Sequence, residues 1–111
     1  MAPRSPLPPS LAARSLSTDE LVLTPEDAIE ALTVLASLPG RVLGWEGWLE
    51  WPDGRRGHSK NYQGTADLSG MATAAAVTFC QTTITADAHQ FRTQPEVPGT
   101  RLLICIAWAP A

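Results

Sequence analysis

Residues 101–108 read Arg-Leu-Leu-Ile-Cys-Ile-Ala-Trp, and they contain most of the longest apolar run of the chain, Leu102 to Ala109. A run of this length fits one β-strand and is far too short for a membrane span, which needs about 18 apolar residues or more. Because alternate residues of a strand point to opposite faces, this strand is apolar on both faces. We therefore expect a central strand that is covered on both sides, or by helices on one side and a partner subunit on the other.

Residues 41–51 form a second predicted strand, because apolar and polar residues alternate along them. One face carries Leu43, Trp45, Gly47, Leu49 and Trp51, and the other carries Gly44, Glu46, Trp48 and Glu50. The Pro52-Asp53-Gly54 sequence that follows predicts a tight turn. The polar segment 55–63 is then expected to return as an edge strand.

Two segments have helical signals. The first starts with Thr24 as a cap and Pro25 in the first turn, and apolar residues recur at helical spacing until Pro39-Gly40. The second, residues 71–91, mixes an alanine run with β-branched threonines. Its length of about 20 residues favours a helix, since strands are rarely so long.

The expected order is helix, strand, strand, helix, strand, with residues 19–23 as an additional first strand. This order predicts a single α+β domain over residues 19–111, in which a small, mostly antiparallel sheet of three to four strands packs against two helices. Residues 1–18 hold four prolines, two arginines and no acidic residue. We expect them to be a disordered or extended N-terminal tail.

The charge and the cysteines restrict the class of protein. The 111 residues carry a formal charge of −3, and residues 19–111 hold 6 basic and 11 acidic residues, which argues against nucleic-acid binding. Cys80 and Cys105 lie in apolar surroundings without metal-ligand spacing. The favoured interpretation is two reduced thiols in a cytoplasmic protein, with one disulfide between them as the alternative. We expect no metal, no cofactor and no membrane association.

The segment 53–64 gathers most of the reactive side chains. Arg55, Arg56 and the backbone donors of a glycine-flanked turn are suited to a phosphate or carboxylate, and His58 is suited to act as a general base. A hairpin that faces water has the same composition, and this structural explanation is the stronger one. The weak candidates for catalysis are His58, His89 and Cys80, and no nucleophile or phosphate-binding motif accompanies them. A small dimeric enzyme or anion-binding domain that uses this hairpin is the second functional hypothesis.

Tryptophans provide a more informative signal, because Trp45, Trp48 and Trp51 fall within seven positions. Trp45 and Trp51 belong to the apolar face, whereas Trp48 lies on the other face between Glu46 and Glu50. If helices cover both faces, Trp48 is a core residue. If they do not, it is an exposed anchor surrounded by carboxylates that suit a basic partner.

The leading functional hypothesis is a small acidic protein-binding module that neutralises a basic partner protein, such as a toxin or nuclease domain. The composition, rich in Ala, Pro, Arg and Trp, is typical of GC-rich bacterial or phage genomes, where such proteins act as immunity proteins or inhibitors. The candidate partner-binding residues are Trp48, Glu46, Glu50, Asp53, Arg55, Arg56 and Tyr62. A homodimer is a further expectation, because it would protect the faces and edges of a small sheet.

Overall fold

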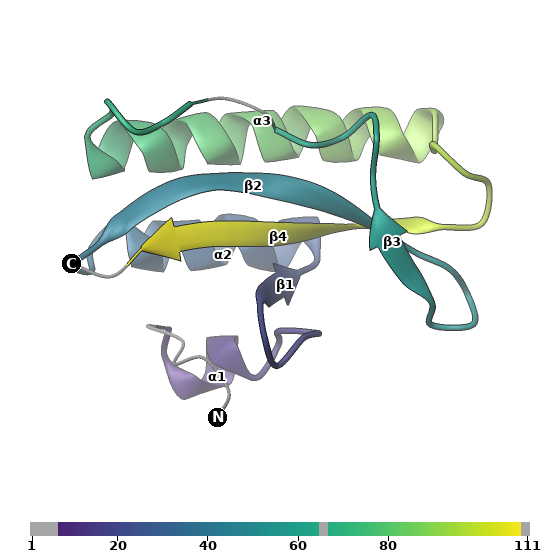
Figure 1. The fold of residues 1–111 in the computed structure, drawn as a ribbon, viewed down its shortest axis with the longest axis horizontal. Helices are drawn as coiled ribbons and strands as arrows, with labels where there is room; N and C mark the ends of the chain where they lie inside the picture. Colours follow the sequence, from purple (N-terminus) through teal and green to yellow (C-terminus); the bar gives the residue numbers. More distant parts are fainter. Residues whose placement is uncertain (1–6, 65–66, 110–111) are drawn as a thin grey trace.

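The computed structural model describes residues 7–64 and 67–109, and these build a four-stranded antiparallel sheet with helices packed on it (Figure 1). The strands lie in the order β1-β4-β2-β3. Their bounds are β1 Leu21–Leu23, β2 Arg41–Glu50, β3 Arg56–His58 and β4 Arg101–Ala109. The α+β class is as the sequence predicts, and so is the order of the elements from β1 onward; one short helix before β1 is additional.

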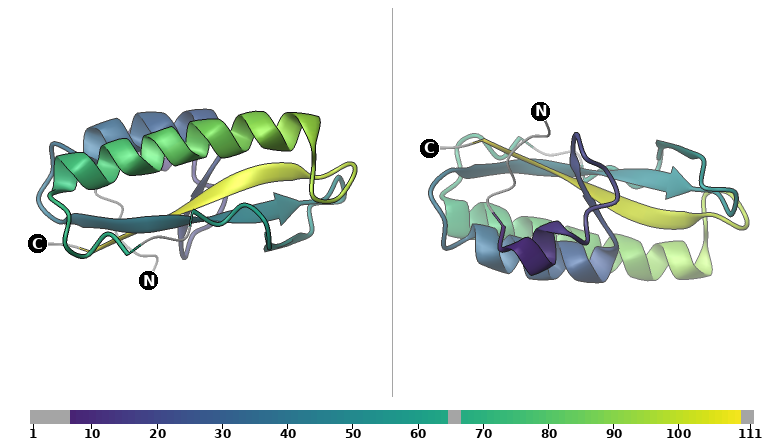
Figure 2. Two further views of the ribbon diagram at one scale, coloured as in Figure 1. Left: turned by 90° about the horizontal axis from the view of Figure 1, so that it is seen from above. Right: turned by 90° about the horizontal axis from the view of Figure 1, so that it is seen from below.

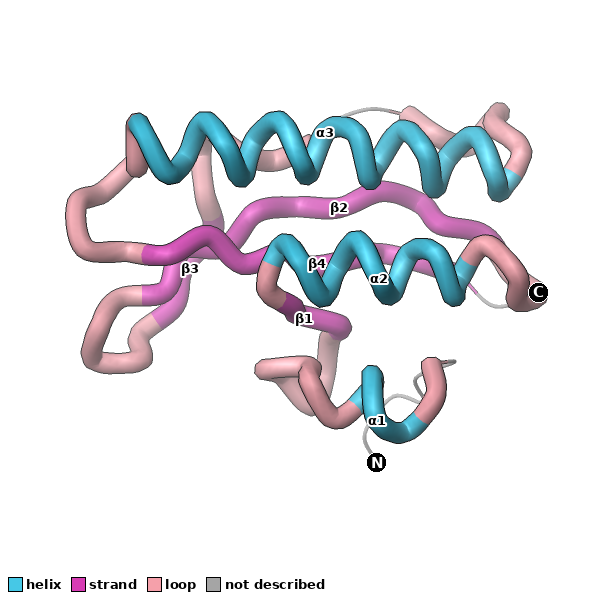
Figure 3. The backbone as a smooth tube through the Cα atoms, turned by 180° about the vertical axis from the view of Figure 1, so that it is seen from behind, coloured by secondary structure: helices cyan, strands magenta, loops and turns pink. Residues whose placement is uncertain are grey.

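Helices α2 (Pro25–Leu35) and α3 (Thr73–Thr93) lie side by side on the same face of the sheet (Figures 2 and 3). The Thr24 Oγ1 caps α2 by accepting a hydrogen bond from the Asp27 N–H at 3.3 Å, as expected. With 21 residues against 11, α3 extends past the N-terminal end of α2. None of the described helices is both long enough and apolar enough to cross a membrane.

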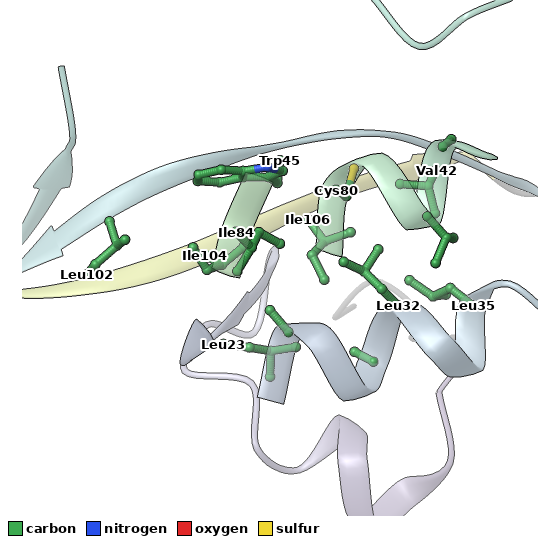
Figure 4. Packing of buried hydrophobic residues seen from close by; sticks show 14 of the residues in the cluster. Leu23, Leu32, Leu35, Val42, Trp45, Cys80, Ile84, Leu102, Ile104 and Ile106 are labelled. Carbon is green, nitrogen blue, oxygen red and sulfur yellow. The ribbon is translucent and has the colours of Figure 1, made fainter. Parts of the chain in front are cut away.

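The main core lies between these two helices and the sheet (Figure 4). Leu23, Leu32, Ile84 and Ile104 are fully buried there and come from β1, α2, α3 and β4. Each such side chain contributes about 1.5–3 kcal/mol when it is removed from water. The core therefore packs both helices against the sheet.

Strand β4 is central, as its apolar character predicts, and it is buried on both faces. Ile104 and Ile106 belong to the core beneath the helices. Leu103 and Cys105 lie on the other face and form a separate apolar cluster with Val22 of β1. The helices thus cover only one of the two apolar faces of this strand.

A bulge in β2 corrects the predicted alternation. The pairing of β2 with β4 shifts register between Val42 and Gly44, and Gly44 has a φ of +151°. Because one residue is added, Val42 rather than Leu43 joins Trp45 in the core. Leu43 moves to the opposite face, where it is 42% exposed.

The N-terminal segment differs from the expectation for residues 7–18, while residues 1–6 lie outside the described part. Pro9–Ala12 form a short helix, α1, and Leu7 and Leu11 are buried in the main core. Proline is tolerated because Pro9 occupies the first helical position, where its missing N–H leaves no bond unmade. Leu7 and Leu11 lie four residues apart, which places them on one face of a helix, but the prolines around them favour an extended chain and outweigh this signal in the sequence.

Two further contacts hold the N-terminal segment in place. Arg14 forms ion pairs with Asp27 and Glu30 of α2, at 3.1 and 2.9 Å. The Leu16 N–H then donates to the Val22 carbonyl at 2.8 Å. The segment therefore runs beside the short edge strand β1 and protects it.

The β2–β3 hairpin closes through the predicted turn, where the Trp51 N–H donates to the Arg55 carbonyl at 2.8 Å and Gly54 has a φ of +90°. The return strand is shorter than expected. It ends at His58, because the next residue, Ser59, turns inward and is fully buried.

Candidate protein-binding face

The face of the sheet opposite α2 and α3 is not covered by any described helix (Figure 2). Its floor is the cluster of Val22, Leu103 and Cys105, and Leu16 and Trp48 pack against that cluster from above. Side chains of β2 and β3, and of Glu20 directly before β1, surround this floor. We call the surface formed by Glu20, Leu43, Glu46, Trp48, His58 and Cys105 the open face.

Trp48 holds a central place on the open face. It is only partly buried, and its register partners are Leu103 on β4 and His58 on β3. Its Nε1–H donates to Glu46 Oε1 at 3.1 Å, and its ring lies 5.5 Å from the imidazole of His58. The tryptophan is therefore fixed in orientation without being part of the main core.

Two carboxylates border Cys105 on the same face. The Cys105 Sγ lies 3.7 Å from Glu20 Oε2, and Glu46 is its register partner on β2. Burial, together with the negative charges of Glu20 and Glu46, raises the pKa of the Cys105 thiol to about 12. Among the described residues no lysine or arginine forms an ion pair with Glu20 or Glu46, and only His58 Nδ1 approaches Glu46, at 3.5 Å. This part of the face is therefore acidic above an apolar floor.

The Glu50 end of the same face is neutralised. Glu50 binds Arg56 at 2.8 Å and Arg101 at 2.7 Å, and its side chain is only 13% exposed. The hydrogen bond from Arg56, helped by that from Arg101, outweighs burial and lowers the pKa of Glu50 below its usual 4.5. Arg56 also donates to the Leu16 carbonyl at 2.7 Å. Glu50 and Arg56 thus fasten the N-terminal segment to the sheet and are engaged within the fold.

The remaining predicted partner-binding residues lie elsewhere. Asp53 and Arg55 pair with each other at 2.8 Å on the exposed hairpin turn, where Arg55 also stacks on Trp51 at 5.6 Å. Tyr62 is only 4% exposed, its hydroxyl donates to the Gln94 carbonyl at 2.7 Å, and its ring packs edge-on against Phe91. Tyr62 is therefore a core residue and does not belong to a binding surface.

The structure also bears on the proposed anion site in the 53–64 segment. The carboxylate of Glu96 accepts hydrogen bonds from Ser59 Oγ at 2.7 Å and from the backbone N–H groups of Lys60 and Asn61. Burial alone would raise the pKa of Glu96, but these hydrogen bonds lower it. The donors that would hold a phosphate or carboxylate are thus occupied by a side chain of the protein itself.

The three weak candidates for catalysis are not brought together. Cys80 is fully buried beneath the helices, and burial raises the pKa of its thiol to about 11. His58 lies on the open face, and His89 is exposed on α3, on the other side of the sheet. Cys80 and Cys105 are free thiols in separate clusters on opposite faces of the sheet, so they do not pair. In the described part of the chain, no group of three His, Cys, Asp or Glu side chains could hold a metal ion.

Four residues of the open face are not among the partner-binding residues that the sequence predicts: Cys105 is expected in the core, His58 only as a candidate base, and Leu43 and Glu20 are missed for different reasons. Leu43 was assigned to the core because the bulge at Gly44 has no clear sequence signal. Glu20 was visible as the acidic residue before an apolar strand, but only the pairing of β1 with β4 places it beside Cys105. Comparisons with models of protein families, with curated proteins and with solved structures found no match for this chain.

Proposed function

We propose that this protein is a binding module that neutralises a basic partner protein, and that the partner docks on the open face. The observation that carries the proposal is the exposure of Leu43 and the partial exposure of Trp48 on a sheet face that no described helix covers. Tryptophan at the centre of a surface is the side chain most often found to dominate binding energy. Leu103 and Cys105 of β4 are already buried, with Leu16 and Trp48 packed against them, so a partner would contact Trp48, Leu43 and the neighbouring carboxylates rather than β4 itself.

Charge complementarity supports a basic partner. Glu20 and Glu46 are the carboxylates of the open face that have no arginine or lysine among the described residues, and both lie beside its apolar floor. Cationic side chains from a partner would pair with them and contact the Trp48 ring. A nuclease or toxin domain with a basic substrate cleft presents such a surface.

A bacterial or phage origin and action in the cytoplasm belong to this proposal. Two free thiols that cannot reach each other across the sheet suit a reducing compartment. The genes beside this one are therefore the first place to look for the partner, and a basic protein encoded there is the binding probe.

The test compares two leucine-sized side chains that are exposed to a similar extent. Leu43 on the open face is 42% exposed, and Met71, which precedes α3, is 39% exposed. Calorimetric titration with the basic neighbour should show that Leu43→Ala weakens the complex by about fivefold or more, as truncation at an interface does. Met71→Ala should leave the affinity within about twofold.

Two results would overturn the proposal. Equal effects of Leu43→Ala and Met71→Ala would place the interface elsewhere. Sedimentation equilibrium of the protein alone is the second measurement, since a dimer that Leu43→Ala dissociates would mean that a second copy covers the open face.

A further inference from the structure

We propose that a cationic side chain of the partner takes the place of His58 beside Glu46, so that docking on the open face requires His58 to be uncharged. This proposal rests on the proposed function and names the chemical group of the partner that reaches the face. It also makes the complex weaker in mildly acidic solution. The geometry of three side chains on β2 and β3 carries it.

Glu46, Trp48 and His58 contact one another on the open face. The Trp48 Nε1–H donates to Glu46 Oε1 at 3.1 Å, which leaves Oε2 as the other oxygen of the carboxylate. His58 Nδ1 lies 3.5 Å from that Oε2, and the imidazole centre lies 5.5 Å from the ring of Trp48. The imidazole therefore lies where a cation of the partner would meet both the carboxylate and the indole ring.

The imidazole holds this position only weakly. The side chain of His58 is 69% exposed and that of Glu46 is 45% exposed, and 3.5 Å is long for a hydrogen bond between them. Exposed pairs of this kind add little to the stability of a fold. His58 is also the last residue of the three-residue edge strand β3, so its side chain can turn away without disturbing the core. A cation of the partner can therefore displace a neutral imidazole.

Protonation of the imidazole reverses this situation. A charged His58 donates to Glu46 and neutralises the carboxylate that would attract the partner. It also repels a second cation that is brought to the same place, and such a contact between like charges is costly once water is excluded. Histidine is the side chain whose charge changes between about pH 5 and 8. Binding should therefore weaken as the pH falls through this range.

The other charged groups near the imidazole are already paired or lie farther away. Arg56, two residues earlier on β3, binds Glu50 at 2.8 Å, and Arg101 of β4 binds the same carboxylate at 2.7 Å. The hydrogen bond from Arg56 lowers the pKa of Glu50, so this network keeps its charge in mildly acidic solution. Glu20 directly precedes β1, and β4 and β2 separate β1 from β3. The imidazole is thus the cation that comes and goes beside the docking position.

The experiment is a calorimetric titration of the full chain with the basic neighbour at pH 7.5 and at pH 5.5. The ratio of the two affinities in His58→Gln measures the pH dependence that belongs to the neighbour itself. The parent should exceed this ratio by about fivefold or more, because only the parent gains a charge beside Glu46. His89→Gln makes the same change on α3, across the sheet, and should keep the pH dependence of the parent.

Proton release provides a readout that a merely structural role of His58 would not change. Titrations at pH 6.5 in two buffers of different ionisation enthalpy should show that the parent releases more protons on binding than His58→Gln does. Equal pH dependence and equal proton release in the two proteins would overturn the proposal. Weak binding of His58→Gln at both pH values would also overturn it, because the imidazole would then be a contact of the partner and not its competitor.

Leu43→Ala, titrated at pH 7.5, separates this proposal from the proposed function. If Leu43→Ala binds as the parent does, the neighbour does not dock on the open face, and both proposals are wrong. If Leu43→Ala weakens the complex but His58→Gln leaves the pH dependence unchanged, only the role of His58 is wrong.

Discussion

The indole N–H of Trp48 donates to the carboxylate of Glu46, two residues earlier on the same face of β2, with Nε1 and Oε1 3.1 Å apart. This hydrogen bond satisfies the only polar atom of the indole ring, so the ring needs no hydrogen-bond partner from the core. The ring itself packs on the face of the sheet that carries Leu103 and Cys105. A tryptophan held in this way loses little further conformational freedom on binding. Glu46 has therefore two roles, to orient the anchor and to supply negative charge beside it.

Reversing the charge at Glu46 should act mainly on the rate of association. We expect Glu46→Lys to slow binding of the basic partner by about tenfold at low salt and to flatten the salt dependence, because surface charges steer encounter. Stopped-flow mixing at two salt concentrations measures both effects. Glu30→Lys makes the same charge change on α2, across the sheet, and should slow association much less. Equal slowing in the two variants would mean that net charge alone matters.

Glu50 should instead affect stability, in a pH-dependent way. Its pKa is lowered by Arg56 and Arg101, so its ionised form stabilises the fold above the unfolded pKa near 4.5, and this contribution is lost as the pH falls through the lower folded value. Urea unfolding should therefore show a larger gap in stability between the parent and Glu50→Gln at pH 7 than at pH 3. Glu30→Gln, whose carboxylate is 56% exposed, is the control. A gap that stays constant with pH would contradict the ion-pair network.

The N-terminal segment should contribute to stability through Leu11. This side chain is 3% exposed in the main core, and Leu11→Ala should cost about 2–3 kcal/mol, because it removes buried surface and leaves a cavity. Thermal unfolding should show a melting temperature lowered by more than about 5 °C. The neighbouring exposed Ser10 provides the control, since Ser10→Ala should change little. A parent-like melt of Leu11→Ala would mean that residues 7–18 do not pack as described.

Ile104 tests the central strand. It is fully buried beneath the helices, and Ile104→Ala should cost about 2–5 kcal/mol. A domain of this size has about 5–10 kcal/mol of stability in total, so the variant should be largely destabilised. Ala107→Ser, at an exposed position of the same strand, should melt close to the parent. If both variants melted alike, β4 would not be the centre of the fold.

Strong periodic signals predicted most of the fold. The capped helix after Thr24, the apolar strand at 101–108 and the hairpin turn at Gly54 each follow from local chemistry, and all three are present. The failures lie where tertiary packing decides. The bulge at Gly44 places Leu43 on the open face instead of in the core. Leu7 and Leu11 are buried in the core although prolines surround them in the sequence.

The candidate site was predictable only in part. Trp48 and Glu46 were found by strict alternation, because no bulge intervenes between Trp45 and Glu50. The prediction that Tyr62 binds a partner is wrong, because its neighbours in the sequence are polar and give no sign that its ring packs against Phe91. Glu20 and Cys105 are 85 positions apart in the sequence, and no local pattern links them.

Trp48 is proposed as a partly exposed anchor for a basic partner, and one measurement tests this role most directly. Trp48→Ala is titrated by calorimetry with the basic neighbour, and its thermal melt is recorded in parallel. We predict that the complex weakens by about 30-fold or more while the variant still unfolds cooperatively as a folded protein, since anchor tryptophans contribute about 2 kcal/mol or more. An unchanged affinity, or a Trp48→Ala protein that no longer folds, would contradict the account.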